Sequence, residues 1–301
     1  MREPGELPPP ALWGKIVRNL RKGTDMASVI DRLVSDDEIR AFHEDGAVRI
    51  RNVISKEWLD TVAEGFAQAM AAPSKYAKSY GPKGAARYYT DHKLYPRFVP
   101  FRRFITDGPL AQVAAEILGA SRIDVYDEHL LLKEPGAPAP TYWHHDMPYF
   151  SIEGYDLASI WFALDPVTEE TGALRFAKGS HKWGKLFRPV RIGENKPVDA
   201  FNRDVLIDRV PDIDSDPETY PTVLLEVDPG DIVVFHGLTL HASGGNKRTD
   251  MPRRAVSYRF AGDDIRWKNR ADAPLVFERA LNDGDPLSLY AEECPQVWPR
   301  A

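Results

Sequence analysis

Hydrophobic and polar residues follow two different periods along the chain. In the first part, apolar residues recur at the spacing of one helix face in three segments. These segments are 35–46, 55–71 and 108–120. The first opens on Ser35, a favoured N-cap that precedes an acidic turn, and it ends near Gly46. We expect a helix in each segment and a short strand over residues 47–53.

From residue 121 onward the pattern changes to short β-rich runs separated by proline and glycine. The runs are 123–134, 157–165, 173–179, 222–228, 231–237 and 255–262. Strands that follow one another without intervening helices are typical of antiparallel sandwiches, jelly rolls and barrels. We therefore predict a mainly β protein with flanking helices, of the α+β class, in which the helices pack on one β core.

Three stretches fall outside this pattern. Residues 1–34 are interpreted as an N-terminal leader, partly flexible, and residues 35–301 as a single domain. The basic and aromatic stretch 75–104 is expected to be an irregular segment laid over the core, with contact to an anionic or flat substrate as the alternative. Residues 182–221 form a long interruption between strands, which indicates a lid or substrate loop.

Composition narrows the class of function. The chain has 301 residues, a formal net charge of -6 and a pI near 5.8, so it lacks the overall basic field of a general nucleic-acid binder. No apolar run approaches the ~20 residues needed to span a bilayer, and the opening stretch lacks the apolar core of a signal peptide. We expect a cytoplasmic protein that acts on a small molecule, without a nucleic-acid partner or a membrane span.

Cysteine chemistry is also limited. The single Cys294 can form neither an intrachain disulfide nor a thiolate zinc site or iron-sulfur cluster. A chain of this size buries enough surface to fold without a structural metal. Any metal is therefore expected to serve chemistry, and its ligands are expected to be nitrogen and oxygen atoms.

A candidate metal site begins in the segment TYWHHDMPYF. His144 and Asp146 are two residues apart, so on an extended strand their side chains leave the same face while His145 leaves the other. The segment PGDIVVFHGLTLHASGGN adds His236 and His241 at the end of an apolar strand. Two histidines and one carboxylate form the facial triad of non-haem Fe(II) oxygenases.

A candidate anion site follows in the segment RRAVSYRF. Arg253, Ala255 and Ser257 share one face of a strand that enters the core. An inward guanidinium needs an anion, and its two-pronged geometry suits the distal carboxylate of 2-oxoglutarate. An arginine in a surface ion pair is the alternative interpretation.

These segments together resemble the phytanoyl-CoA dioxygenase family of Fe(II)/2-oxoglutarate oxygenases. The resemblance runs from about Ser35 and is carried by DDEIRAFHEDGAVRIRNV, WHHDMPYF, TGALRFAKGSH, PGDIVVFHGLTLHASGGN and RRAVSYRF. It implies a double-stranded β-helix, the cupin-like jelly roll, with the N-terminal helices packed on it. Lys178 stands where the family pattern usually has proline, outside the metal segments.

The resemblance also implies roles for single residues. His144, Asp146 and His241 match the iron ligands, and Arg253 matches the arginine that binds 2-oxoglutarate. Ser243 and Trp161 match positions near the same cosubstrate, so the resemblance implies that they contact it as well. The remaining histidines match no ligand: His181 and His236 are interpreted as structural, and His43, His92 and His129 as having ordinary roles.

The implied activity is that of a dioxygenase that uses Fe(II), 2-oxoglutarate and O2, forms succinate and CO2, and hydroxylates an unactivated C–H bond of a small metabolite. Desaturation, ring formation and demethylation are further outcomes of the same chemistry. Because Asp146 is present, halogenation is not expected. Two alternatives remain: a jelly-roll hydrolase or isomerase with Zn²⁺ on the same ligands, and a non-catalytic 2-oxoglutarate sensor.

Overall fold

The computed structural model describes residues 32–193, 208–270 and 281–300. Almost all of the predicted leader therefore lies outside the described residues, and the proposed division into leader and domain stays a prediction. Within the described part, no helix is both long enough and apolar enough to cross a bilayer.

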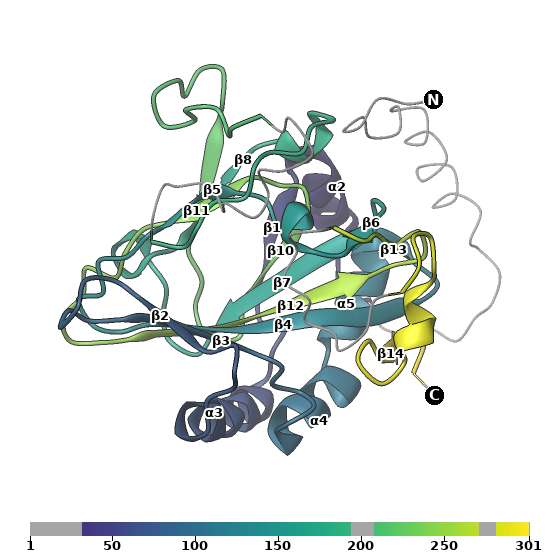
Figure 1. The fold of residues 1–301 in the computed structure, drawn as a ribbon, viewed down its shortest axis with the longest axis horizontal. Coiled ribbons are helices and arrows are strands. Elements are labelled where there is room, and N and C mark those ends of the chain that lie inside the picture. The colour runs from purple at the N-terminus through teal and green to yellow at the C-terminus, as the bar shows by residue number, and fades with distance from the viewer. Residues whose placement is uncertain (1–31, 194–207, 271–280, 301) are drawn as a thin grey trace.

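Two antiparallel sheets form the centre of the molecule (Figure 1). The larger is 8-stranded and the smaller 4-stranded. The larger contains, in spatial order, β1 (Ala47–Ile50), β10 (Ile232–His236), β7 (Leu157–Ala163), β12 (Arg253–Ala261), β4 (Ile123–Lys133), β3 (Tyr88–His92) and β2 (Lys78–Tyr80), and β14 (Gln296–Trp298) also pairs with β4. The smaller contains β5 (Thr141–His144), β11 (His241–Ser243), β8 (Leu174–Ala177) and β9 (Thr222–Leu225). A separate pair joins β6 (Ile152–Glu153) to β13 (Arg266–Trp267).

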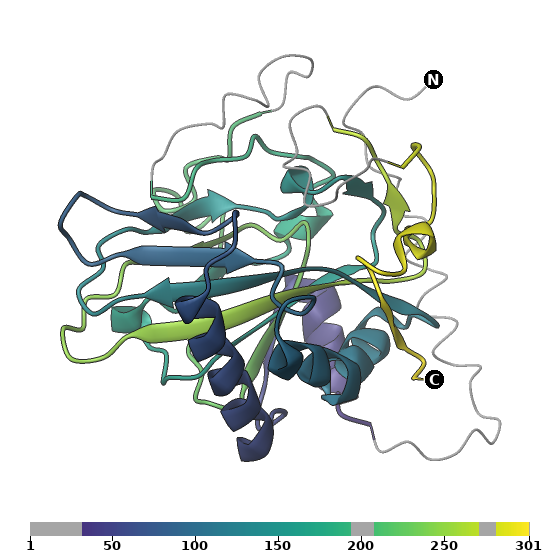
Figure 2. The same ribbon diagram turned by 60° about the horizontal axis from the view of Figure 1, so that its bottom comes forward.

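Helices cover the outer face of the large sheet (Figure 2). They are α2 (Asp36–Asp45), α3 (Lys56–Ala71), α4 (Val99–Asp107) and α5 (Leu110–Leu118). Apolar side chains of these helices, such as Phe42, Phe66 and Phe104, form one core with the outward side chains of the strands, such as Ile160 and Tyr258. The predicted α+β class, with helices packed on an antiparallel core, is confirmed.

The first predicted helix shows how the sequence sets its ends. Ser35 accepts a hydrogen bond from the Glu38 backbone N–H, and the Glu38 side chain accepts one from the Ser35 N–H, which completes a capping box. At the other end Gly46 has a φ of 83°, and a Cβ there would lie 2.4 Å from Nδ1 of His181. Only glycine fits this left-handed C-cap.

The segment 75–104 is not irregular, so that part of the prediction was wrong. It contains β2, β3 and α4. β3 pairs with β4 from Tyr88 opposite Lys133 to His92 opposite His129. β3 is buried along almost its whole length on both faces, so it lacks the polar alternation by which a half-exposed strand is found in a sequence.

Register places a defined set of side chains on the inner face of the large sheet. Along β12, Val256, Tyr258 and Phe260 point outward into the helical core. The alternate residues therefore face the small sheet. They are Arg253, Ala255, Ser257 and Arg259, and they lie opposite Lys133, Leu131, His129 and Asp127 of β4, respectively.

The interruption at 182–221 is described only in part. Phe187 is buried against Ile213 and Leu240, and a bridge pairs Phe187 with Asp208. Ile192 reaches the space between the sheets. The proposed lid includes residues 194–207, which lie outside the described residues, so this interpretation stays a prediction.

Candidate metal centre

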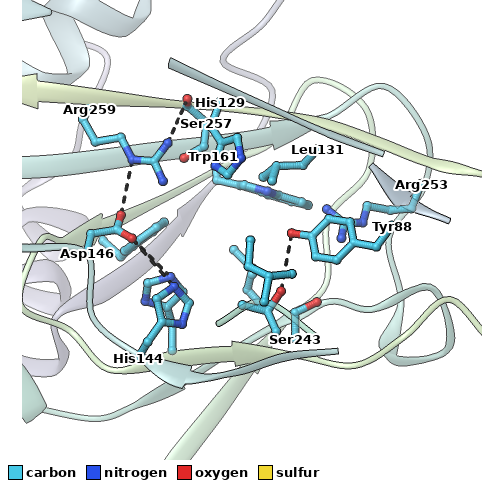
Figure 3. A pocket seen from close by; sticks show the side chains of 15 residues that line it. Tyr88, His129, Leu131, His144, Asp146, Trp161, Ser243, Arg253, Ser257 and Arg259 are labelled. Carbon is cyan, nitrogen blue, oxygen red and sulfur yellow. Dashed lines mark hydrogen bonds and ion pairs between the residues drawn. The ribbon is translucent and has the colours of Figure 1, made fainter. Parts of the chain in front are cut away.

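A pocket opens between the two sheets and encloses about 470 Å³, part of it continuous with solvent (Figure 3). Both sheets contribute to its walls. From the predicted site residues it is lined by His144, Asp146, Trp161, His241, Ser243 and Arg253. The sequence therefore identified residues from four separate segments that the fold brings to one cavity.

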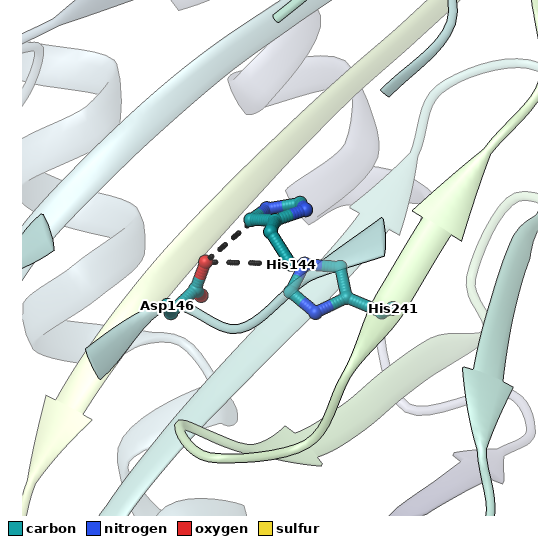
Figure 4. Close-up of side chains that lie close together, drawn as sticks. All are labelled: His144, Asp146 and His241. Carbon is teal, nitrogen blue, oxygen red and sulfur yellow. Dashed lines mark ion pairs between the residues drawn. The ribbon is translucent and has the colours of Figure 1, made fainter. Parts of the chain in front are cut away.

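Three of these residues form a potential metal site (Figure 4). His144 ends β5 and His241 begins β11, and the two lie directly opposite each other in the small sheet. Oδ1 of Asp146 is 3.8 Å from Nε2 of His144 and 3.8 Å from Nε2 of His241. One ligand atom from each residue lies within 4.8 Å of the other two, so a single ion can contact all three.

The local reason for this convergence differs from the prediction. β5 ends at His144, and Asp146 has φ -73° and ψ -38° at the start of the 3-10 turn Met147–Tyr149. A turn, not a shared strand face, brings the carboxylate back to the imidazole. His145 points away, as predicted: its Nδ1 lies 3.3 Å from the Leu238 carbonyl and its Nε2 accepts the Phe187 N–H at 2.9 Å.

The protonation states suit a divalent cation. Nδ1 of His144 is 2.8 Å from the Tyr142 carbonyl, and Nδ1 of His241 is 3.0 Å from the Thr239 carbonyl. Both Nδ1 atoms therefore carry the proton, and both Nε2 lone pairs face the site. Burial lowers the pKa of His144, and burial together with His144 lowers the pKa of His241 to about 3. Both rings are thus neutral, the form that binds a metal.

The carboxylate of Asp146 is held by residues that the sequence interpretation missed. The Ser159 hydroxyl donates to Oδ2 at 2.8 Å, and Nε of Arg259 lies 3.4 Å from Oδ2. Burial alone would raise the pKa of Asp146, but Arg259 and the two histidines lower it below its usual value. Oδ2 is occupied by the protein, and Oδ1 remains directed at the histidines.

At the other end of the pocket, Arg253 is buried to 1% exposure. Its guanidinium lies 5.5 Å from the ring of Trp161 (Figure 3). Burial lowers the pKa of Arg253, and a side-chain contact with Tyr88 and the more distant charge of Asp165 offset this only in part. Within the described residues Arg253 forms no ion pair, and its Nε has no hydrogen-bonding partner. A surface ion pair is instead made by the neighbouring Arg254, which binds Asp165 through two nitrogens. A buried cation without an anion is unfavourable, so this geometry indicates a site for an anionic ligand.

Lys133 and Tyr88 lie beside Arg253, since Lys133 is opposite Arg253 on β4 and Tyr88 is opposite Lys133 on β3. Neither was predicted as a site residue. Lys133 is fully buried, and its Nζ donates to the Ser243 hydroxyl at 2.8 Å and to the Gly244 carbonyl. The Ser243 hydroxyl in turn donates to the Gly172 carbonyl at 2.8 Å. Ser243 therefore lines the pocket, as predicted, with its hydrogen already engaged by the protein.

The other histidines divide into two groups. Nδ1 of His236 accepts the Leu238 N–H at 3.1 Å, and Nε2 of His181 is 3.2 Å from the His43 carbonyl. Neither His181 nor His236 lines the pocket, which agrees with their structural interpretation. His129 does line it and stacks on His92 with the ring centroids 4.0 Å apart, and its ordinary role stays a prediction.

Comparisons with known protein families and structures identify what this chain is similar to. A sequence profile of the phytanoyl-CoA dioxygenase family (PhyH) matches residues 42–255, which is more than half of the 301 residues. The chain belongs to the phytanoyl-CoA dioxygenase family. The predicted resemblance is thus confirmed over both halves of the pocket.

Individual proteins match over shorter stretches. A probable phytanoyl-CoA dioxygenase of Caenorhabditis elegans is 31% identical over 123 residues, which are 40% of this chain and 36% of the nematode protein. A probable alpha-ketoglutarate-dependent hypophosphite dioxygenase of Stutzerimonas stutzeri is 31% identical over 172 residues, 56% of this chain and 52% of that protein. The matches thus span about a third and about half of these relatives.

Solved structures confirm the jelly-roll fold that the family resemblance implied. The nogalamycin-biosynthesis epimerase SnoN, in complex with Fe3+, alpha ketoglutarate and nogalamycin RO, superposes with a TM-score of 0.67 at 23% identity, over 87% of this chain and 98% of that one. The carbocyclase SnoK superposes with a TM-score of 0.69 at 22% identity, over 88% and 96% of the two chains.

Proposed function

We propose that this member of the phytanoyl-CoA dioxygenase family is an Fe(II)- and 2-oxoglutarate-dependent dioxygenase that oxidises a C–H bond of a small metabolite. The observation that carries the proposal is a pairing within one pocket. His144, Asp146 and His241 surround one ion position, while the buried Arg253, which forms no ion pair with any residue that the structure describes, stands at the opposite end. A ligand that chelates a metal and carries a distal carboxylate satisfies both ends at once.

The donor set fits Fe(II). Two neutral imidazoles and one carboxylate leave coordination positions for a chelating cosubstrate and O2, which is the arrangement of non-haem iron oxygenases. When bound, Fe(II) supplies the redox chemistry that couples O2 to oxidation of a C–H bond while 2-oxoglutarate becomes succinate and CO2.

Residues of the protein would bind and orient 2-oxoglutarate and keep water out of the pocket. Arg253 is placed to bind the distal carboxylate of 2-oxoglutarate with two N–H groups, and Trp161 packs against its guanidinium. Leu131, Leu174 and Phe235 form an apolar part of the pocket wall. Such walls exclude water and strengthen the electrostatic contacts inside.

We propose hydroxylation as the reaction outcome. Asp146 occupies the ligand position that related halogenases leave to chloride, which disfavours halogenation. Two structural relatives are named as an epimerase and a carbocyclase, so the same fold supports other oxidative outcomes. The choice among them depends on which C–H bond the substrate presents.

The alternative of a zinc hydrolase or isomerase on the same three ligands is disfavoured by Arg253. Activation of water by Zn²⁺ needs no buried cation at the far end of the pocket. A non-catalytic sensor would share the cosubstrate site but would not turn over. Metal and cosubstrate dependence therefore separate the candidates.

The decisive experiment measures succinate formation by protein reconstituted with Fe(II) or Zn(II), with 2-oxoglutarate and O2, across a panel of metabolites. We expect succinate only with Fe(II), at a rate raised by the true substrate. Arg253→Lys should raise the 2-oxoglutarate requirement, whereas the matched Arg254→Lys should leave it unchanged. Turnover that does not depend on 2-oxoglutarate would contradict the proposal.

A further inference from the structure

His129 and Ser257 line the metal end of the pocket beside Arg259, which faces Asp146. His129 on β4 and Ser257 on β12 lie directly opposite each other on the inner face of the large sheet, and Arg259 follows on the same face of β12. All three line the pocket (Figure 3). We call His129, Ser257 and Arg259 the polar patch.

All three members of the polar patch have unused hydrogen-bonding capacity, although Nε of Arg259 also faces Oδ2 of Asp146 at 3.4 Å. Across the part of the chain that the structure describes, Oγ of Ser257 and Nε2 of His129 meet no hydrogen-bonding partner, although both atoms are buried. Ser257 as a whole is only 1% exposed. Buried polar groups in folded proteins are almost always satisfied by protein, water or ligand. These two atoms therefore need water or a ligand as a hydrogen-bonding partner.

The charges around the patch are already balanced by the protein. Arg259 faces Oδ2 of Asp146 at 3.4 Å. Across the strands, Asp127 pairs with Nδ1 of His92 at 3.2 Å. Burial lowers the pKa of His129 well below its usual value, so this ring is neutral. The patch differs in this from the Arg253 end, where an uncompensated cation calls for an anion.

We propose that the polar patch binds a neutral hydroxyl or carbonyl oxygen of the prime substrate and so holds an oxygenated small molecule beside the metal. This inference rests on the proposed function and specifies its substrate class. Ser257 can donate a hydrogen bond to either oxygen, and His129 can donate or accept according to its tautomer. A plain hydrocarbon chain would leave both groups unsatisfied, and a carboxylate would place a second negative charge near Asp146.

The test uses binding rather than turnover. Protein loaded with Zn(II) and 2-oxoglutarate is titrated with benzyl alcohol, toluene and benzoate, and dissociation constants are obtained by ligand-observed NMR. We expect benzyl alcohol to bind about tenfold more tightly than toluene, because two net hydrogen bonds together account for about a factor of ten. Benzoate should bind more weakly than benzyl alcohol.

Variants locate the effect. Ser257→Ala and His129→Phe, which keeps a ring stacked on His92, should each reduce the preference for the alcohol over toluene to about twofold or threefold. Ser151→Ala is the matched control, since Ser151 is buried but does not line the pocket. It should keep the full preference. If one of the two patch variants fails to fold, the other still decides.

Four outcomes would overturn the inference. Toluene could bind as tightly as the alcohol, benzoate could bind more tightly, or both variants could keep the preference, which would mean that ordered water satisfies the patch. A loss of 2-oxoglutarate affinity in the variants would instead assign the patch to the cosubstrate. If the wild-type protein bound no 2-oxoglutarate, the proposed function would fail, and the same titration with Zn(II) alone would still decide the role of the patch.

Discussion

Arg253 and Arg259 lie on the same strand, β12, point to the same side of it and are both nearly buried, at 1% and 7% exposure. They differ in what they meet. Arg259 faces the carboxylate of Asp146, while Arg253 meets no carboxylate among the described residues. The guanidinium of Arg259 pairs with a carboxylate of the protein itself. The guanidinium of Arg253 indicates that an anionic ligand binds beside it. A buried charge is informative because of its partners rather than its position.

The strongest test of this contrast removes the carboxylate. We expect Asp146→Ala to abolish iron binding and turnover, because it deletes a ligand and leaves Arg259 as an unpaired buried charge. The unfolding free energy should also fall, by about 3 kcal/mol, the cost of breaking a buried ion pair on one side. Iron content and denaturant unfolding measure the two effects.

His144→Ala should likewise lose iron, with the fold retained. The control is His145→Ala, whose imidazole points away from the ion position. That variant should lose some stability, since the Phe187 N–H loses its acceptor, but it should keep its iron. Full iron occupancy in Asp146→Ala or His144→Ala would remove these residues from the metal site.

The next test addresses the other guanidinium. Arg253→Lys replaces a two-pronged donor by a point charge, so the concentration of 2-oxoglutarate needed for half-maximal turnover should rise by about 10-fold to 100-fold. Titration of 2-oxoglutarate against initial rates measures this change. An unchanged requirement would mean that the cosubstrate carboxylate is bound elsewhere.

A stability comparison sharpens the contrast without any ligand. Arg253→Leu removes an uncompensated buried charge and should raise the unfolding free energy of the ligand-free protein by about 1 kcal/mol. Arg259→Leu leaves Asp146 without its cation and should lower the unfolding free energy by about 3 kcal/mol. Urea unfolding of metal-free protein compares the two. Shifts of the same sign would show that the arginines have equivalent surroundings.

The smallest expected effect concerns Lys133, which lies opposite Arg253 but already donates to Ser243 and to a backbone carbonyl. Burial and the neighbouring Arg253 lower the pKa of Lys133 well below its usual value, so Lys133 should contribute less to cosubstrate binding than Arg253. We expect Lys133→Met to weaken 2-oxoglutarate binding to the Zn(II)-loaded protein by about threefold, well below the effect of Arg253→Lys. Calorimetric titration gives the dissociation constant, and an effect larger than that of Arg253→Lys would reverse the assigned order.

Much of the site follows from local sequence patterns. The alternation of residues along β12 correctly predicts that Arg253 points inward. The same alternation places Arg259 on the inner face, although Arg259 was not predicted as a site residue. The helix caps at Ser35 and Gly46 are likewise local signals that the structure reproduces.

The remainder depends on pairings between distant segments. Tyr88 and His129 line the pocket because β3, β4 and β12 pair in one particular register, which no local pattern specifies. Asp146 was assigned for an incorrect local reason, since a turn carries it to the histidines. Spacing in a sequence indicates which residues can meet, but the backbone path by which they meet is a property of the fold.

The small sheet is made of strands only three or four residues long, yet its two neighbouring strands β5 and β11 carry both imidazoles of the ion position. An ion bound there would link β5, β11 and the turn after β5 through its three ligands. Ion binding and the arrangement of the small sheet are then coupled, and the free energy of ion binding stabilises this sheet. Removal of the metal by a chelator should therefore loosen the small sheet before it affects the helices that cover the large sheet.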